Sequence, residues 1–249
     1  MIGMWVKICG NTNLEDAALA AELGADAVGF IFAASKRQLR PEQVAAITAQ
    51  LPANVERVGV FDSHDAQEIA RATQAAGLTA VQLHGGFDEA LLEQLGPMLA
   101  ASGVKIIQTL HWTVNDQMPN RPHDPAEGAV EAPVELLARQ IRRVAAIGAA
   151  DRVLIDSKLG TASGGTGVAF DWAAARRLFA AAPAGVRLIV AGGLKPENVA
   201  QAIEELAPWG VDVCSGVEEV AGRKNPDRLA HFIGAARATG KTAQAPTDS

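Results

Sequence analysis

Cys9 and Asp156 are the residues whose type and position most suggest chemistry. Cys9 closes a short apolar run that begins at Trp5, and Asp156 follows the apolar run 153–155, so each lies where a buried strand would end. Lys7 precedes Cys9 by two residues and shares its side of an extended strand, and a nearby ammonium favours the thiolate, the form of cysteine that can act as a base. The alternatives are an inert buried thiol and a carboxylate that only holds a turn.

Glycine-rich turns follow three of the apolar runs. The loop after Asp156 carries Gly164 and Gly165, and the turns after the last two runs carry Gly192, Gly193, Ser215 and Gly216. Bare backbone amides beside a helix start bind phosphate well, and the corresponding turns of many α/β barrels do so. A phosphorylated substrate is therefore expected, with simple tight turns as the alternative.

Three further polar residues lie at or near strand ends. Asp212 interrupts the apolar run 211–214 and points to the opposite face from its neighbours, so it needs a buried partner, for which Lys7 is the candidate. That pair could be catalytic or purely structural. His84 could form a wall or a polar rim of a site, and Arg37 could bind a carboxylate bidentately or lie solvated in its basic loop.

Eight strand–helix units position these residues. Continuous apolar strands alternate with helices, and several units repeat the order helix, glycine, apolar strand, which predicts a parallel sheet covered by helices. The predicted strands span 5–9, 27–32, 58–61, 80–83, 104–108, 153–155, 186–190 and 211–214, and the predicted helices 14–23, 41–50, 66–76, 88–95, 134–147, 172–181, 196–206 and 226–238. Eight units in 249 residues favour an α/β fold of the single closed (β/α)8 barrel type. An open doubly wound sheet is the alternative, weakened because no turn carries the dinucleotide glycine fingerprint.

The barrel is expected to form one domain over residues 1–238. A proline-rich stretch at 113–133, after the fifth strand, is predicted to be a surface insertion, because the alternation resumes after it. The polar segment 239–249 is predicted to be a frayed tail.

Composition limits the partners and the compartment. The net charge of −6 and the pI of about 5.4 give no reason to expect nucleic acid or an anionic membrane surface as a partner. No apolar run reaches the roughly 18 residues of a membrane span, and the immediate first strand leaves no room for a signal peptide. These features suggest a cytoplasmic protein.

Cysteine and histidine usage predicts neither a metal nor a disulfide scaffold. The two cysteines, Cys9 and Cys214, could approach one another, but a reducing cell argues against a disulfide between them. The remaining histidines, His64, His111, His123 and His231, show no ligand spacing, and no role is assigned to them. Neither a metal nor a cofactor is expected.

The motifs taken in order resemble phosphoribosylanthranilate isomerase of tryptophan biosynthesis, from Val6 to Ile233. They are Val-Lys-Ile-Cys-Gly (6–10), Gly-Ala-Asp-Ala-Val-Gly-Phe-Ile-Phe (24–32), Ser-Lys-Arg (35–37), Arg-Val-Gly-Val-Phe (57–61), Val-Gln-Leu-His-Gly (81–85), Leu-Ile-Asp (154–156), Gly-Gly-Thr-Gly (164–167), Phe-Asp-Trp (170–172), Ala-Gly-Gly-Leu-Lys-Pro-Glu-Asn-Val (191–199) and Val-Asp-Val-Cys-Ser-Gly-Val-Glu (211–218).

The resemblance implies an Amadori rearrangement of N-(5-phosphoribosyl)anthranilate to 1-(2-carboxyphenylamino)-1-deoxyribulose 5-phosphate. It implies Cys9 as general base, Asp156 as general acid and Arg37 as the contact to the anthranilate carboxylate. Asp212 matches a further functional aspartate. The family's phosphate site falls on Gly164, Gly165, Gly192, Gly193, Ser215 and Gly216. A monomer or a homodimer is expected.

The sequence departs from the family pattern at Cys214, where serine is usual, in the length of the 113–133 insertion and in a loop before Ser35 that looks one residue short. Two rival functions stay open. Another sugar-phosphate barrel enzyme would carry a different catalytic set, such as aspartate in place of Cys9. A phosphate-binding barrel without catalysis would not need both Cys9 and Asp156.

Overall fold

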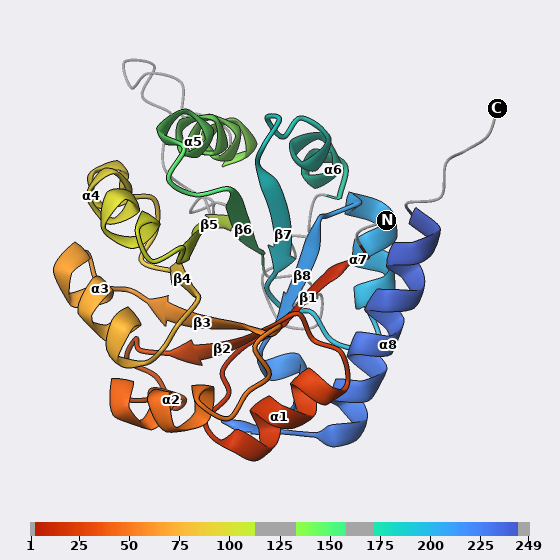
Figure 1. Ribbon diagram of the computed structural model, residues 1–249. Coiled ribbons are helices and arrows are strands. Elements are labelled where there is room, and N and C mark those ends of the chain that lie inside the picture. Colours follow the sequence, from red (N-terminus) through yellow and green to blue (C-terminus); the bar gives the residue numbers. More distant parts are fainter. Residues whose placement is uncertain (1–2, 113–132, 158–171, 244–249) are drawn as a thin grey trace, which may run out of the picture.

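Eight parallel strands form a closed barrel with helices around its outside (Figure 1). This computed structural model describes residues 3–112, 133–157 and 172–243. Each strand pairs with the next along the chain, and β8 pairs with β1 to close the ring. The predicted single (β/α)8 barrel is confirmed, and the open doubly wound sheet is excluded.

The barrel strands are β1 (Trp5–Ile8), β2 (Ala27–Ile31), β3 (Glu56–Phe61), β4 (Ala80–Leu83), β5 (Lys105–Trp112), β6 (Arg152–Ser157), β7 (Arg187–Ala191) and β8 (Gly210–Val213). The helices are α1 (Leu14–Glu22), α2 (Pro41–Thr48), α3 (Ala66–Ala75), α4 (Glu89–Ala100), α5 (Pro133–Ile147), α6 (Trp172–Ala180), α7 (Val199–Leu206) and α8 (Pro226–Ala243). A 3-10 turn, η1 (Ser215–Val217), and a short hairpin, β9 (Glu218–Val220) and β10 (Arg223–Lys224), connect β8 to α8.

Both faces of the barrel strands are buried, which explains their continuous apolar sequence. Alternate residues point outward and pack beneath the helices, as Val6, Val28 and Val211 do. The other set fills the barrel interior with one layer of mainly apolar side chains, which includes Trp5, Ala27, Val58, Ala80, Ile107, Leu154 and Ile189. Above this layer, toward the carboxyl ends of the strands, the interior positions become polar, and that change of character places a site at this end of the barrel.

Strand β5 is longer than predicted. The sequence placed its end at Gln108, whereas it continues to Trp112 because its last residues pair with β6, with His111 opposite Asp156 and Trp112 opposite Ser157. The extension places His111 at the carboxyl end of the barrel, where no role had been assigned to it.

The carboxyl-terminal part of the chain also differs from the prediction. The hairpin of β9 and β10 was not predicted, and helix α8 continues past the predicted end at Ala238 to Ala243. The proposed insertion at 113–133 lies outside the described residues except for Pro133, which begins α5.

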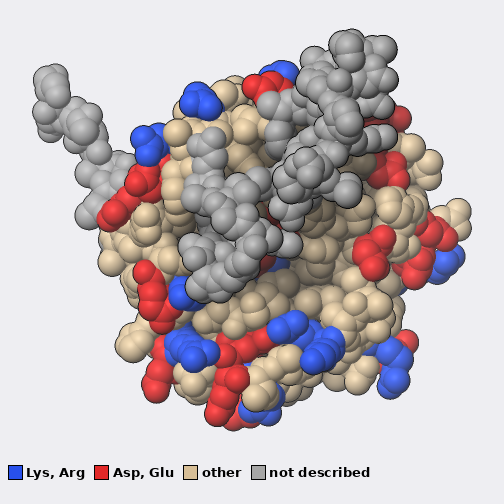
Figure 2. Space-filling view, turned by 180° about the vertical axis from the view of Figure 1, so that it is seen from behind, with Lys and Arg blue, Asp and Glu red and all other residues tan. Residues whose placement is uncertain are grey.

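The surface carries charges of both signs. Lysine and arginine are interspersed with aspartate and glutamate around the face shown in Figure 2. Among the described helices, none combines the length and the apolar character that crossing a membrane requires.

Candidate active site

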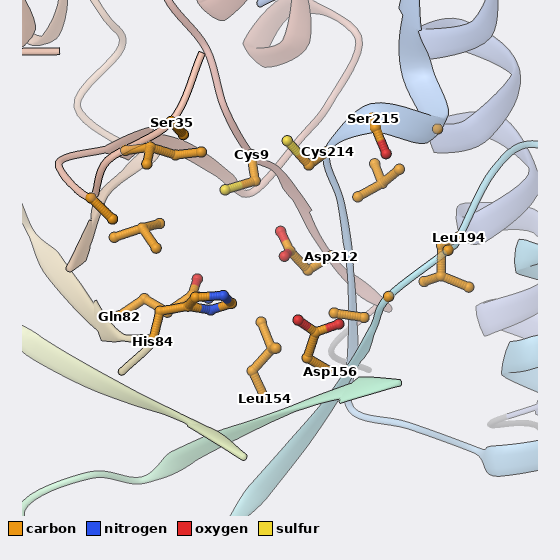
Figure 3. Close-up of a pocket in the computed structure, with 18 of the residues that line it drawn as sticks. Cys9, Ser35, Gln82, His84, Leu154, Asp156, Leu194, Asp212, Cys214 and Ser215 are labelled. Carbon is orange, nitrogen blue, oxygen red and sulfur yellow. The ribbon is translucent and has the colours of Figure 1, made fainter. Parts of the chain in front are cut away.

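A cavity of about 400 Å³ opens at the carboxyl ends of the barrel strands (Figure 3). Most of the predicted site residues that the structure describes line it: Cys9, His84, Asp156, Gly192, Gly193, Asp212, Ser215 and Gly216. Cys9 and Asp156 thus belong to the same cavity, as the strand-end positions predicted. Gly164 and Gly165 lie outside the described residues, so their predicted part in the site is untested.

Cys9 lies beside a buried ion pair between Lys7 and Asp212. Lys7 Nζ donates to Asp212 Oδ1 at 2.8 Å, and strand pairing sets Lys7 opposite Asp212. The predicted partner of Asp212 and its direction into the barrel are therefore confirmed. Burial acts to lower the pKa of Lys7, but the charges of Asp212 and Cys9 outweigh burial and raise it, so Lys7 stays an ammonium.

The Cys9 thiol has a lowered pKa. Hydrogen bonding with the Cys214 thiol is the largest cause that lowers its pKa, burial opposes it, and the Lys7 ammonium lowers it further, to about 7. An ordinary cysteine has a pKa of about 8.5 and is only a few per cent thiolate at neutral pH. At neutral pH a much larger fraction of Cys9 is therefore thiolate, at the polar end of the barrel interior.

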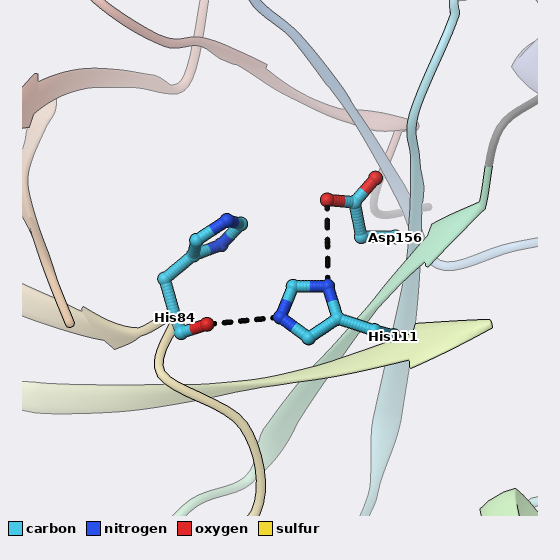
Figure 4. A group of neighbouring side chains, drawn as sticks. All are labelled: His84, His111 and Asp156. Carbon is cyan, nitrogen blue, oxygen red and sulfur yellow. Dashed lines mark hydrogen bonds and ion pairs between the residues drawn. The ribbon is translucent and has the colours of Figure 1, made fainter. Parts of the chain in front are cut away.

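Asp156 lies across the cavity with two histidines beside it (Figure 4). His111 Nδ1 is 3.7 Å from Asp156 Oδ2, and His111 Nε2 contacts the backbone oxygen of His84 at 2.9 Å. The rings of His84 and His111 meet edge to face, 4.9 Å between centroids. Because a carbonyl oxygen only accepts, His111 Nε2 must carry a proton.

The second ring nitrogen of His111, Nδ1, faces Asp156. With Nε2 protonated, Nδ1 faces the carboxyl group either with a second proton of its own or as the acceptor of a proton held by Asp156. The pKa of His111 is raised, first by its interaction with Asp156, whereas burial and the charge of His111 lower the pKa of His84. The His111–Asp156 pair therefore retains a proton more readily than a solvated histidine would.

The same three side chains are also where a metal ion would fit. His84, His111 and Asp156 each offer one ligand atom, and these atoms lie within 4.8 Å of one another. Two histidines and a carboxylate suit a divalent transition metal. Without an ion, His111 and Asp156 contact each other, whereas the buried Nδ1 of His84 has no hydrogen-bond partner among the described residues. The sequence-based expectation of no metal stays a prediction.

The glycine turns pack too tightly for any side chain. A Cβ on Gly192, whose φ is +90°, would lie 1.6 Å from the Ser157 backbone oxygen and 2.5 Å from Asp156 Oδ1. A Cβ on Gly216 would lie 1.9 Å from the Leu194 backbone oxygen. Close chain packing alone thus requires glycine here, and at Gly192 the missing side chain also makes room for the Asp156 carboxylate.

Arg37 is the exception among the predicted site residues that the structure describes. It is not part of the cavity lining, because its guanidinium forms a bidentate ion pair with the buried Glu218. Arg37 Nε donates to Glu218 Oε1 at 2.7 Å, and Arg37 Nη2 donates to Glu218 Oε2. Burial opposes ionisation of Glu218, but Arg37 and Lys224 lower its pKa, and Glu218 in turn raises the pKa of Arg37. The pair leaves Arg37 Nη1 for another acceptor.

Lys224 connects this pair to the carboxyl ends of β1 and β8. Its buried Nζ donates to the backbone oxygens of Cys9 at 2.5 Å and Cys214 at 3.2 Å, and lies 3.4 Å from Glu218 Oε1. No periodic pattern in the sequence points to Lys224, which lies in β10 of the unpredicted hairpin. His111 could have been found, because it shares the alternation of Ile107 and Thr109, interior residues of the same strand.

Comparison with known proteins gives a consistent result. The family model described as "N-(5'phosphoribosyl)anthranilate (PRA) isomerase" matches residues 6–118 and 129–235. The isomerase of Pelobacter propionicus is 38% identical over 94% of this chain and 96% of its own. The crystal structure of the Thermotoga maritima enzyme matches with a TM-score of 0.73 and 34% identity over 94% of this chain and 99% of that chain.

A further solved structure of such an isomerase holds reduced 1-(o-carboxyphenylamino)-1-deoxyribulose 5-phosphate. It matches with a TM-score of 0.70 and 32% identity over 94% of this chain and 99% of that chain. The matches run through every barrel strand and include the positions of Cys9, Asp156 and the glycine turns after β7 and β8. This chain therefore belongs to the N-(5'-phosphoribosyl)anthranilate isomerase family.

Proposed function

We propose that this chain converts N-(5-phosphoribosyl)anthranilate to 1-(2-carboxyphenylamino)-1-deoxyribulose 5-phosphate, an isomerisation in tryptophan biosynthesis. The observation that carries the proposal is an activated thiol and a carboxyl group in one cavity, in a chain that matches the family over almost its whole length. The reaction moves protons between carbon, oxygen and nitrogen, so an acid and a base are the groups it requires.

Asp156 acts as the general acid in this proposal. Protonation of the ribose ring oxygen lets the C1'–O bond break while the anthranilate nitrogen forms a Schiff base with C1'. A free carboxyl group with a pKa near 3.9 is almost fully ionised at neutral pH. The neighbouring His111 can supply the missing proton, because its raised pKa lets it hold a proton next to Asp156 and pass it to that carboxylate.

Cys9 acts as the general base in this proposal. The Schiff base acidifies the hydrogen on C2', and the thiolate removes it to leave an enolamine, which becomes the ketone of the product. Lys7 keeps the thiolate charged, and Asp212 keeps Lys7 in place. General acid and base groups of this kind each contribute about 10²- to 10⁴-fold.

The remaining parts of the substrate have candidate partners. The phosphate is assigned to backbone amides of the glycine turns 192–193 and 215–216, with Gly164 and Gly165 as further predicted contacts. The anthranilate carboxylate is assigned to the free Nη1 of Arg37, which Glu218 holds in one orientation. His84 forms part of the wall. Cytoplasmic location and a monomeric or homodimeric state are predictions from the sequence.

The test is loss of anthranilate-type fluorescence after purified protein meets phosphoribosylanthranilate generated in situ. The expected result is rapid loss with the intact chain and formation of the aminoketose, identified by mass and by retention time against an authentic standard. A protein that binds the phosphorylated substrate without converting it would support the rival of a non-catalytic phosphate-binding barrel and would contradict the proposal.

A further inference from the structure

Cys9 and Cys214 lie side by side at the carboxyl ends of neighbouring strands. Strand pairing sets Ile8 opposite Val213, the residues just before them, and the Cys9 amide donates to the Val213 oxygen at 2.8 Å. Adjacent strands lie about 4.7–4.9 Å apart, within the Cα separation of about 4.4–6.8 Å that a disulfide spans. The backbone is therefore already placed for a bond between the two sulfurs.

Two further contacts hold the pair in this position. Lys224 Nζ donates to the backbone oxygens of both cysteines and so ties the two strand ends together. Gly10 has no side chain, and a Cβ there would lie 2.6 Å from Cys214 Sγ, so the Cys214 sulfur rests directly over the backbone that follows Cys9. Both cysteines also line the cavity, which gives a small oxidant access to them.

The two thiols differ in reactivity. Hydrogen bonding with Cys214 lowers the pKa of Cys9 to about 7, and the same interaction, with burial, raises the pKa of Cys214. At neutral pH Cys9 is thus the thiolate that reacts with an oxidant, and Cys214 is a neutral thiol held within reach of the product. A low-pKa accessible cysteine beside a second one is the usual arrangement of a reversible oxidation site.

We propose that Cys9 and Cys214 form a site of reversible oxidation by peroxides, with Cys9 as the residue that reacts with the peroxide and Cys214 as the resolving one. The Cys9 thiolate attacks one oxygen of hydrogen peroxide, the O–O bond breaks, and hydroxide leaves, so that Cys9 is oxidised to a sulfenic acid and peroxide is reduced. Cys214 sulfur then attacks the Cys9 sulfur, an S–S bond forms, and the sulfenic hydroxyl leaves as water with the Cys214 proton. A small dithiol reverses the reaction by exchange.

The disulfide would switch off the isomerase, a consequence that rests on the proposed function of Cys9 as general base. It would also protect that base, because a sulfenic acid without a resolving thiol is oxidised on to sulfinic acid, which thiols do not reduce. In a reducing compartment such a bond is transient, as protein disulfides there usually are when they have a sensing role.

The test compares the intact chain with Cys214→Ser, each scaled to its own untreated activity. Both are treated with hydrogen peroxide, measured for isomerase activity and intact mass, treated with dithiothreitol, and measured again. We expect the intact chain to lose activity together with about 2 Da, the two thiol hydrogens, and to regain both with dithiothreitol. The Cys214→Ser variant should gain about 32 Da at Cys9 and stay about tenfold or more below its untreated activity after dithiothreitol.

Peptide mapping locates each mass change and separates cysteine oxidation from oxidation of the four methionines. The proposal is overturned if the intact chain gives sulfinic Cys9 as readily as the variant does, or if the disulfide forms and activity persists. Mass alone reports the disulfide, so a chain that forms it but never shows isomerase activity would refute the proposed function and leave the oxidation chemistry established.

Discussion

Replacing Glu218 by glutamine is expected to weaken substrate binding through Arg37, without touching the reacting atoms. Glu218 Oε1 accepts from Arg37 Nε at 2.7 Å and from the Gly222 amide at 3.2 Å, while Oε2 accepts from Arg37 Nη2. Glutamine can replace only one of these oxygens, and its NH₂ group then faces a guanidinium N–H. At least one charge-assisted hydrogen bond is lost, which is worth about 1.5–3 kcal/mol.

If the lost hydrogen bond is what orients Arg37 toward the substrate, the whole loss appears in substrate binding. KM for phosphoribosylanthranilate should then rise by about 10- to 150-fold, since each 1.4 kcal/mol is a factor of ten. The anthranilate carboxylate is remote from the bonds that change, so kcat should change far less. Steady-state kinetics with thermal unfolding measures both effects. Glu219→Gln is the matched control, because Glu219 is the exposed neighbour of the buried Glu218.

The orientation of Arg37 by Glu218 would be refuted if Glu218→Gln lowered Tm but left KM at the level of the Glu219→Gln control. The contacts of Glu218 with Arg37, Gly222 and Lys224 would then serve the stability of the fold and not substrate binding. Rescue is a further check. Glu218→Asp keeps both oxygens and should recover part of the loss in KM.

Three other outcomes are expected. Arg37→Ala should raise KM more than it lowers kcat in steady-state kinetics, and an unchanged KM would leave Arg37 without a substrate contact. Because Cys9 acts as a thiolate and its pKa is lowered to about 7, kcat should fall as pH decreases through 7, approaching tenfold per unit below it; a pH–rate profile that is flat from about pH 5 to 8 would contradict this. Asp156→Asn should prevent ring opening and lower kcat by about 10²- to 10⁴-fold, and rapid-quench analysis that found accumulated open Schiff base in this variant would remove Asp156 from the role of acid.

The sequence was sufficient for the barrel and for the ion pair inside it. Eight alternating strand–helix units at this length favoured a closed barrel over an open sheet, and the parity of Asp212 against its neighbours predicted its direction. Lys7 followed as its partner because the first and last strands of a closed barrel adjoin, and the pair is present at 2.8 Å. The strand pattern predicted which way each side chain points, and the closed topology predicted which strands are neighbours.

The sequence was not sufficient where tertiary contacts determine an element. The end of β5 is set by pairing with β6, so the role of His111 was missed together with the last residues of that strand. The partner of Arg37 depends on the 3-10 turn η1, which precedes Glu218, and no periodic pattern in the sequence predicts such a turn. The position of Lys224 at the site was missed for the same reason. Its acceptors are backbone oxygens, which every residue has, so no residue type in the sequence indicates them.

The most direct test of Cys9 as general base is kcat of the Cys9→Ser variant. Serine keeps the size and the hydrogen-bonding capacity of the residue, but its hydroxyl is far too weak a base near neutral pH. We predict that kcat falls by about 10²- to 10⁴-fold, that thermal unfolding stays close to that of the intact chain, and that the open Schiff base accumulates. A Cys9→Ser enzyme with near-normal kcat would contradict the assignment of Cys9 as the base and the proton-transfer mechanism built on it.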